Sequence, residues 1–234
     1  MSATPKARSG RSKTAARRGG ETGKQRSKSA KSSIIELAVI VLVALGLAWG
    51  IQAVIIKPYR IPSGSMEPTL AIGQRVLVNR IGMELGKPHI GEIVVFHPPV
   101  GAEEGASGER AKCGPTPYVV VEGTSACSQP IPKEASVNFI KRIVAGPGDV
   151  ISIVEGHVIR NGVREQDSYT RPCAEREPKC SFPKPITIPA DHWFMMGDNR
   201  GDSDDSRFWG PVPTSWIIGG AFATYWPPDR IGFL

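Results

Sequence analysis

Residues 137–154 read VNFIKRIVAGPGDVISIV and hold two short apolar runs on either side of a Gly-Pro-Gly-Asp segment at 146–149. β-Branched runs of this length, bounded by glycine and proline, are typical of strands joined by a turn. Residues 75–81 (RVLVNRI) alternate apolar and polar side chains, the pattern of a half-buried strand, and residues 90–96 (IGEIVVF) form another β-branched run. These four runs predict a β-sheet.

The rest of the chain after residue 57 adds turn signals and no long helix. Glu155-Gly156 is a turn dipeptide, and Asn161-Gly162 is of the kind that closes a β-hairpin. No segment there keeps a 3.6-residue apolar period for three turns, and the chain's 21 prolines and 26 glycines suit many short strands and loops. We therefore expect residues 57–234 to form a mainly β domain, built on a coiled antiparallel sheet.

The first 33 residues differ from the rest in composition. They hold ten lysines or arginines against one acid, Glu21, and no large apolar residue after Met1. Such a segment cannot bury enough surface to offset its ordering entropy, so residues 1–33 are predicted to be a disordered basic tail. The chain carries +7 overall, of which +9 lies in this tail and −1 at Glu36, so residues 57–234 sum to −1.

Residues 34–56 form an apolar stretch of 23 residues whose polar members, Glu36 and Gln52, lie near its ends. A helix of about 20 residues crosses the hydrocarbon core of a bilayer. The alternative is a cleaved signal peptide, but its apolar core usually has about 7–15 residues and a small-x-small site follows it directly. This stretch is longer and has no such site after it. We predict a retained transmembrane helix.

The basic tail sets the expected orientation of that helix. A basic segment can bind nucleic acid or an anionic bilayer, and the apolar stretch that follows this one favours the bilayer, so we expect no nucleic acid partner. By the positive-inside rule the tail lies in the cytoplasm. Residues 57–234 are therefore predicted to lie outside the plasma or inner membrane, on a single-pass anchor.

All four cysteines fall in the part predicted to be external. None belongs to a C-x-x-C pair, and an even number of cysteines in an oxidising compartment indicates disulfides. Proximity favours Cys113 with Cys127 and Cys173 with Cys180, although four cysteines allow three connectivities. Four reduced, buried thiols are the alternative.

Lys141 is unusual for its place in the predicted strand. On a strand it shares a face with Val137, Phe139 and Ile143, and lysine is rarely buried without a partner. Burial disfavours the ammonium and lowers the pKa, which would make the amine available as a general base. The alternative is a lysine on an edge strand that extends its charged end into water.

Residues 61–70, IPSGSMEPTL, are the second candidate for chemistry. Two prolines stiffen the backbone on either side of Ser63-Gly64-Ser65, so the segment can present a hydroxyl and a backbone N–H to one point. By itself this pattern is weak, since proline, glycine and serine also make ordinary turns.

Residues 196–210, MGDNRGDSDDSRFWG, are the third candidate. The aspartates suggest a calcium loop, but no register supplies both the glycine at position six and the glutamate at position twelve of an EF-hand. Arg200-Gly201-Asp202 spells an adhesion tripeptide, but so short a motif often occurs by chance.

Together these segments resemble the bacterial type I signal peptidases, the Ser–Lys endopeptidases that remove signal peptides from exported proteins. Four segments match the family's boxes in the right order: PSGSMEPTL, RVLVNRI with GEIVVF, FIKRIVAGPGD, and GDNRGDSDDSR. The resemblance implies a membrane-bound serine endopeptidase that cuts after a small-x-small motif. Its partners would be signal peptides of exported preproteins and the lipid bilayer.

The resemblance also implies a role for individual residues. Ser65 aligns with the nucleophile and Lys141 with the general base. Ser63 and the backbone N–H of Ser65 align with the oxyanion hole, and Ser203 with the serine that orients the lysine amine. The charged pair that supports the site aligns with Asp205 and Arg207, and the residues expected to line the substrate pocket are Ile61, Met66, Leu70, Phe139 and Ile140.

The implied mechanism is acyl transfer without a metal or an organic cofactor. None of the four histidines lies in the four boxes, so a triad built on histidine is not expected. Ser65 follows the predicted span by nine residues, which reach at most about 30 Å, so the nucleophile must work close to the outer membrane surface. Signal peptides present their cleavage site at that surface.

Two segments depart from the family pattern as we expect it. Residues 97–133, which contain Cys113 and Cys127, are longer than expected and read as a loop insertion. The segment between the last two boxes is short, which predicts a reduced subdomain at about 150–190. Two alternatives remain: a Ser–Lys peptidase that matures one particular exported protein, and an anchored binding or adhesion module without catalysis.

Overall fold

The computed structural model describes residues 30–81, 86–102, 113, 125–175 and 177–234. The chain divides into two units, Met1–Leu45 and Gly46–Leu234. Most of the predicted tail, residues 1–29, and most of the predicted insertion, residues 103–112 and 114–124, lie outside the described residues.

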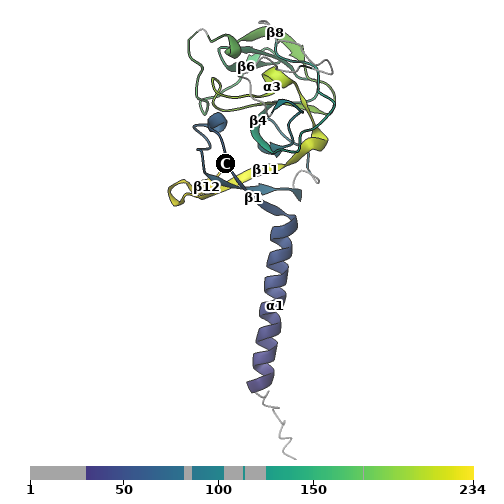
Figure 1. Ribbon diagram of the computed structural model, residues 1–234, viewed down its shortest axis with the longest axis vertical. Helices are drawn as coiled ribbons and strands as arrows, with labels where there is room; N and C mark the ends of the chain where they lie inside the picture. Colours follow the sequence, from purple (N-terminus) through teal and green to yellow (C-terminus); the bar gives the residue numbers. More distant parts are fainter. Residues whose placement is uncertain (1–29, 82–85, 103–112, 114–124, 176) are drawn as a thin grey trace, which may run out of the picture. The chain divides into compact units, whose positions relative to one another are not determined.

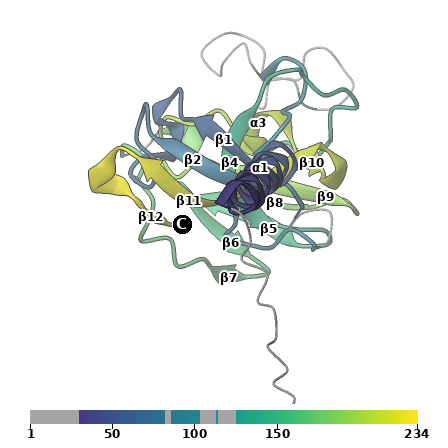
Figure 2. The ribbon, with the colours of Figure 1, turned by 90° about the horizontal axis from the view of Figure 1, so that it is seen from below.

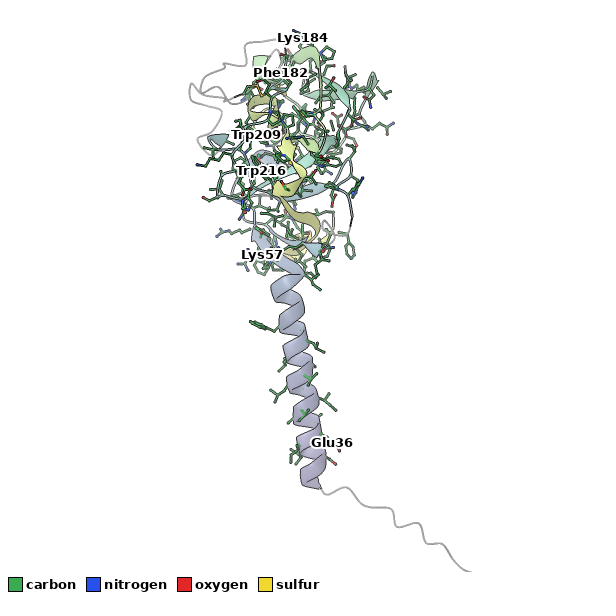
Figure 3. All side chains as sticks on the ribbon, turned by 90° about the vertical axis from the view of Figure 1, so that its right-hand side faces the viewer. Glu36, Lys57, Phe182, Lys184, Trp209 and Trp216 are labelled. Atoms are coloured by element: carbon green, nitrogen blue, oxygen red, sulfur yellow. A yellow bond between two sulfur atoms is a disulfide. The ribbon has the colours of Figure 1, made fainter. Side chains whose placement is uncertain are left out.

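Helix α1 spans Ala30–Val54 and contains the predicted apolar stretch up to Val54. It is the one described helix that is long and apolar enough to cross a membrane. Its large apolar side chains from Ile34 to Trp49 are exposed, and Figure 3 shows side chains projecting from the helix on several sides, with Glu36 toward its N-terminal end. A helix that is apolar all round suits a lipid environment. The helix ends two residues before the predicted boundary, because Ile56 already pairs with Asn79 in a sheet.

The second unit contains a large antiparallel sheet in the order β1-β2-β11-β3-β4-β9-β10, with β12 paired to β11. Figure 1 labels four of its strands, β1, β4, β11 and β12. Register shifts interrupt the pairing of β11 with β2 and β3, and of β4 with β9. Such irregularities bend and twist strands, so the sheet curls. Its strands are β1 (Ile56–Arg60), β2 (Arg75–Asn79), β3 (Ile93–Phe96), β4 (Phe139–Ala145), β9 (His192–Met196), β10 (Val212–Pro213), β11 (Ile217–Trp226) and β12 (Gly232–Phe233).

A smaller antiparallel sheet is inserted between β4 and β9, in the order β7-β6-β5-β8. Figure 2 shows β5, β6 and β7 side by side and apart from β2 and β12. Its strands are β5 (Val150–Val154), β6 (His157–Arg160), β7 (Val163–Arg164) and β8 (Phe182–Thr187). Positive φ angles at Glu155, Gly156, Asn161 and Gly162 close its two tight hairpins, as the turn dipeptides predict.

Short helical segments connect the strands: η1 (Gly64–Met66), η3 (Pro178–Cys180), α3 (Ser206–Trp209), η4 (Thr214–Trp216) and η5 (Pro228–Arg230). The core consists of three apolar clusters, one of which packs Ile61, Met66 and Leu70 against Val76, Val78, Ile93 and Val95. This cluster fixes the segment before β2 against the large sheet.

The predicted mainly β fold with one N-terminal apolar helix is therefore confirmed. The four predicted strands correspond to β2, β3, β4 and β5, with ends that differ by up to three residues. The structure also joins Cys113 to Cys127 and Cys173 to Cys180, the pairing that proximity favours. The second pair closes the connection between β7 and β8.

Candidate active site

Lys141 lies in the third position of β4 and pairs with Val94 of β3. Only 4% of the residue is exposed, and its Nζ lies 5.6 Å from the ring centre of Phe139. Strand β4 lies between β3 and β9 in the sheet, so it is not an edge strand. The alternative of a lysine that extends into water is wrong.

Ser65 lies in the short helix η1, and its backbone is held on both sides. The Ile61 N–H donates to Gln74 O at 2.8 Å, and the Glu67 N–H donates to Gly64 O at 3.0 Å. The hydroxyls of Ser63 and Ser65 lie 3.4 Å apart. Among the residues that the structure describes, no oxygen accepts the backbone N–H of Ser65, which leaves that donor available beside the Ser63 hydroxyl.

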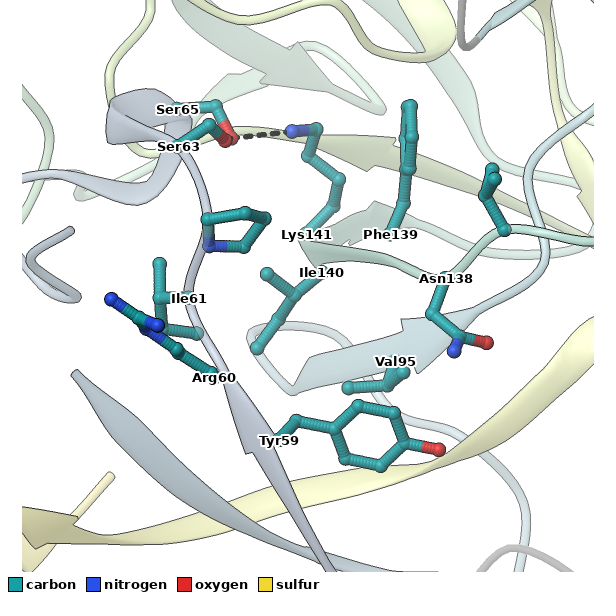
Figure 4. Close-up of a pocket in the computed structure, with 12 residues that line it drawn as sticks. Tyr59, Arg60, Ile61, Ser63, Ser65, Val95, Asn138, Phe139, Ile140 and Lys141 are labelled. Atoms are coloured by element: carbon teal, nitrogen blue, oxygen red, sulfur yellow. Dashed lines mark hydrogen bonds between the residues drawn. The ribbon is translucent and has the colours of Figure 1, made fainter. Parts of the chain in front are cut away.

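The two side chains meet although 76 residues separate them in the sequence. Lys141 Nζ donates to Ser65 Oγ at 2.6 Å, and Figure 4 shows both groups, with Ser63, at one end of a cleft. Ser65 is 8% exposed, so this contact is nearly out of water. A serine hydroxyl in hydrogen-bond contact with a buried amine is the geometry required for proton transfer between them.

Burial lowers the pKa of Lys141 from 10.5 to about 8. The carboxylates of Asp205, Asp204 and Asp198 act in the opposite direction and raise this pKa, while the Arg207 guanidinium lowers it. A pKa of about 8 leaves roughly a tenth of the amine neutral at pH 7 and most of it neutral at pH 9. The amine can therefore accept a proton close to neutral pH.

Asp205 and Arg207 form a buried ion pair next to the amine. Arg207 Nε and Nη2 donate to the two oxygens of Asp205 at 2.8 and 2.9 Å, and both residues are fully buried. Asp205 also accepts the Gly197 N–H at 3.1 Å, and Arg207 donates to Ser203 O at 3.1 Å. The pair thus fixes the loop between β9 and α3. Burial raises the pKa of Asp205, but the Arg207 guanidinium, the Lys141 charge and the Gly197 N–H together bring it below its ordinary value.

Ser203 lies beside the segment of Ser65 but does not make the predicted hydrogen bond to the lysine amine. Its Oγ is buried and has no hydrogen-bond partner among the described residues. A Cβ on Gly197 would lie 2.2 Å from this Oγ and 2.4 Å from Ser65 O. The two loops therefore touch at a point where only glycine fits, and the hydroxyl lies at that contact.

Asn199 and Asp198 connect the same loop to the rest of the site. The sequence did not indicate this role for either residue; Asp198 was considered only as one of the aspartates of a calcium loop. Asn199 donates from its backbone N–H to Ser65 O at 3.0 Å and from its side chain to Gly64 O at 3.1 Å. Asp198 accepts from Arg142 Nε and Nη2, at 2.9 and 2.7 Å, and from Thr69 Oγ1 at 2.6 Å. The two hydrogen bonds from Asn199 to the carbonyls of Ser65 and Gly64 depend on the fold, so no sequence pattern could have indicated them.

The aspartates of this loop do not gather around a common point. Asp198 binds Arg142, and Asp205 binds Arg207. Asp204 is half-buried, and burial followed by the nearby Asp205 raises its pKa to about 7. Outside this loop, Cys173, Glu177 and Cys180 offer ligand atoms close together, but the two sulfurs are joined in a disulfide and are not available as thiolates.

A cleft of about 560 Å³ runs from Ser65 and Lys141 between the segment after β1 and the start of β4 (Figure 4). Of the five predicted pocket residues, Ile61, Phe139 and Ile140 line it. Met66 and Leu70 do not: both are fully buried in the apolar cluster beneath the segment. Further lining residues that the sequence did not indicate are Tyr59, Arg60, Pro62, Val95, Val137 and Asn138.

A serine hydroxyl bonded to a buried amine, at the end of an apolar cleft in a β domain, is an arrangement compatible with the class of serine hydrolases. The family model described as "Signal peptidase, peptidase S26" matches residues 34–226. The chain belongs to this family of signal peptidases, and is accordingly a serine endopeptidase that cleaves signal peptides.

The relatives agree with this assignment. A probable signal peptidase I-2 of Synechocystis is 33% identical over 214 residues, which cover 92% of this chain and 83% of the relative. Signal peptidase I of Leptolyngbya laminosa is 33% identical, with 88% and 86% covered. Signal peptidase I of Mycobacterium tuberculosis is 28% identical, with 86% and 76% covered. Most of each chain is aligned, and one N-terminal apolar helix fits a single membrane anchor.

Proposed function

We propose that this chain removes signal peptides from exported preproteins after a small-x-small motif, with Ser65 as nucleophile and Lys141 as general base. The observation that carries the proposal is the 2.6 Å hydrogen bond between Lys141 Nζ and Ser65 Oγ, buried beside an apolar cleft. The lowered pKa of Lys141 supports it, because the neutral amine is the form that can take the serine proton.

The reaction begins with transfer of the Ser65 proton to the neutral amine of Lys141. The alkoxide attacks the scissile carbonyl, and the carbonyl electron pair moves to oxygen to give a tetrahedral intermediate. The Ser63 hydroxyl and the backbone N–H of Ser65 are the donors proposed for that oxyanion, since both lie at the nucleophile.

The intermediate collapses when the Lys141 ammonium gives its proton to the leaving amine. The first product departs, and Ser65 remains as an ester. Neutral Lys141 then takes a proton from a water molecule, whose oxygen attacks the ester and restores the free serine. The Asp205–Arg207 pair and Ser203 are assigned supporting roles, because they hold the loop that packs against Ser65.

The shape of the cleft supports a preference for small apolar residues before the cut. Ile61 and Ile140 face each other across its middle, and Phe139 lies on the side of Lys141 (Figure 4). Side chains of this size leave room for alanine-like residues near Ser65, and burial of apolar area contributes to their binding. The small-x-small motif is the specificity that we propose for this cleft.

We also propose that residues 57–234 form an extracytoplasmic catalytic domain and that the basic tail stays in the cytoplasm. The ten basic side chains within residues 1–33 support this orientation, as does the presence of two disulfides in the β domain. Anchoring enzyme and substrate in one membrane raises their effective concentration, so moderate affinity in the cleft suffices.

The test is cleavage of a model preprotein by the purified full-length chain, with the cut located by mass spectrometry. Ser65→Ala and Lys141→Ala are expected to lose cleavage, and Lys141→Arg as well because arginine does not deprotonate in proteins. Ser152→Ala on β5 and Lys184→Ala on β8 are matched controls that should cleave normally. Normal cleavage by Ser65→Ala would overturn the assignment.

A further inference from the structure

A second cavity, of about 410 Å³, opens at one end of the large sheet. Its polar lining includes Arg80, His97 and Ser215, and its apolar lining includes Trp216, Ile217 and Ile218. None of its lining residues lines the cleft at Ser65. The cavity is therefore separate from the proposed peptidase site.

Strand pairing explains why these residues meet. β11 lies between β2 and β3, with Asn79 opposite Gly220 and Phe96 opposite Ile217. Arg80 follows the last residue of β2, and His97 follows the last residue of β3. The His97 N–H donates to Trp216 O at 3.0 Å. The ends of two strands and the beginning of a third thus place a cation, an imidazole and an indole at one edge.

The cavity combines a positive charge with apolar surface. Such a combination suits a ligand that has an anionic group attached to an apolar part. Arg80 is exposed and its side chain has no ion pair or hydrogen bond with any described residue. No aspartate or glutamate lines the cavity. An exposed arginine suits phosphate, which accepts paired hydrogen bonds from the planar guanidinium. Trp216 and the two isoleucines offer apolar surface beside it.

The position of Arg80 in the chain relates the cavity to the membrane. The Arg80 N–H donates to Ile55 O at 2.9 Å, and Ile55 directly follows the last residue of α1, Val54. Ile56 in turn pairs with Asn79. Arg80 is therefore one hydrogen bond away from the point where the chain leaves its anchor. Tryptophan and arginine are both frequent at the headgroup level of membranes.

We propose that this cavity binds the phosphodiester headgroup of an anionic phospholipid, with Arg80 as its main ligand and Trp216 at the border to the acyl chains. The inference rests on the membrane-anchored topology of the proposed function, and not on the roles of Ser65 and Lys141. A headgroup bound there would hold the sheet edge at the bilayer surface. Basic pockets close to the membrane commonly bind lipid headgroups.

The test uses the full-length chain, purified in detergent and equilibrated with phosphatidylglycerol, and native mass spectrometry to count the lipids that stay bound. We expect one retained lipid on the unaltered protein and about fivefold lower occupancy for Arg80→Gln. Arg164→Gln, which removes an exposed arginine from β7 on the other sheet, should retain the lipid. Equal occupancy in unaltered protein and Arg80→Gln, or an equal loss in Arg164→Gln, would overturn the proposal.

Two further measurements distinguish a lipid site from a site for soluble phosphate, and a loss of lipid binding from a loss of folding. Glycerol 3-phosphate in millimolar excess should not displace the lipid, because the apolar wall contributes only when acyl chains are present; displacement would identify a site for soluble phosphate and contradict the proposal. The melting temperatures of the two arginine variants should lie within a degree or two of the unaltered protein. Lower lipid occupancy would then not be caused by unfolding. Cleavage that depends on Ser65, measured on the unaltered protein, tests the peptidase proposal independently.

Discussion

Lys141 lies in an environment where two opposing effects decide its charge. Burial alone disfavours the ammonium, while three carboxylates close by favour it, and burial is the larger effect. A fall from 10.5 to about 8 corresponds to roughly 3 kcal/mol of differential stabilisation of the neutral form. The balance lets the amine both take up and release a proton, as the base that we propose for Ser65 must do.

Three carboxylates raise the pKa of Lys141. Asp205 pairs with Arg207 and Asp198 pairs with Arg142, whereas Asp204 belongs to neither of these ion pairs. Because its charge raises the pKa of Lys141, we expect Asp204→Asn to lower that pKa. The acid limb of kcat/KM then moves to lower pH, and at pH 7 the rate rises by at most about tenfold, since roughly a tenth of the amine is already neutral there. A pH profile of peptide cleavage measures the shift. The control is Asp202→Asn, an exposed neighbour, whose profile should not move; a shift to higher pH in Asp204→Asn would contradict the account.

Gly197 determines how closely two loops of the site can approach. A methyl group there would lie 2.2 Å from Ser203 Oγ and 2.4 Å from Ser65 O, so Gly197→Ala must push the nucleophile segment away from Lys141. A displacement of about 1 Å at a reacting group costs on the order of 100-fold in rate. We expect a loss of that size in kcat. Gly232→Ala, where nothing lies within 4 Å of the new methyl group, should leave kcat unchanged.

At the scale of elements, Asp198 joins three segments that lie far apart in the sequence. It accepts hydrogen bonds from Arg142 on β4 and from Thr69 after η1, and its own loop holds Ser65 O through Asn199. Arg142 also donates to Gly91 O at 2.7 Å and stacks 4.2 Å from the ring centre of Tyr169. This arrangement fixes the distance between the strand of Lys141 and the segment of Ser65.

Arg142→Lys tests that arrangement without removing the charge. Lysine cannot donate two parallel N–H groups to a carboxylate, so Asp198 would be left partly unsatisfied in a buried site. We expect a loss of about 2–3 kcal/mol in the free energy of unfolding, seen as a lower urea midpoint. Arg164→Lys on the exposed strand β7 provides the comparison and should change the midpoint little. An unchanged midpoint in Arg142→Lys would show that Asp198 does not depend on a bidentate partner.

The same scale shows what the sequence could and could not predict. Strands with β-branched residues, such as β2 and β5, were recognisable, whereas β11 was not, because Gly219 and Gly220 interrupt its apolar run. Gly219 is there for a reason visible only in space: a Cβ would lie 2.4 Å from Asn79 O on the neighbouring strand. An apolar residue close to Ser65 in the sequence can face either the cleft or the core. In so short and irregular a segment, the sequence has no periodic pattern that tells which of the two it faces. Ile61 lines the cleft, whereas Met66 is buried in the core.

For the whole molecule, the site depends on contacts between segments near residues 65, 141 and 200, on a domain that follows a membrane anchor. The resemblance could indicate Ser65 and Lys141 because their local motifs are specific. It could not indicate Asn138 or Tyr59, which line the cleft only because β1, β3 and β4 curl toward one another. The insertion predicted at 97–133 lies mostly outside the described residues, and its role stays a prediction.

The orientation of the chain in the membrane is a prediction at this scale. Replacing the ten lysines and arginines of residues 1–33 by glutamine removes the charge bias that places the tail inside. We expect a mixed population, in which part of the β domain faces the cytoplasm. Protease added to spheroplasts, whose cell envelope is opened outside this membrane, then digests only the outward fraction, whereas the unaltered chain should be digested almost completely. Full protection of the unaltered β domain would contradict the proposed topology.

The most direct test of the account is the ionisation of Lys141 in the folded, full-length protein. Lysine labelled with ¹³C at Cε reports the charge of its amine in an NMR titration, and Lys141→Arg, which lacks that signal, assigns it. We predict a midpoint at about pH 8, in line with the acid limb of kcat/KM. A midpoint near 10.5, the ordinary value for lysine, would mean that Lys141 stays charged at neutral pH and cannot serve as the base for Ser65.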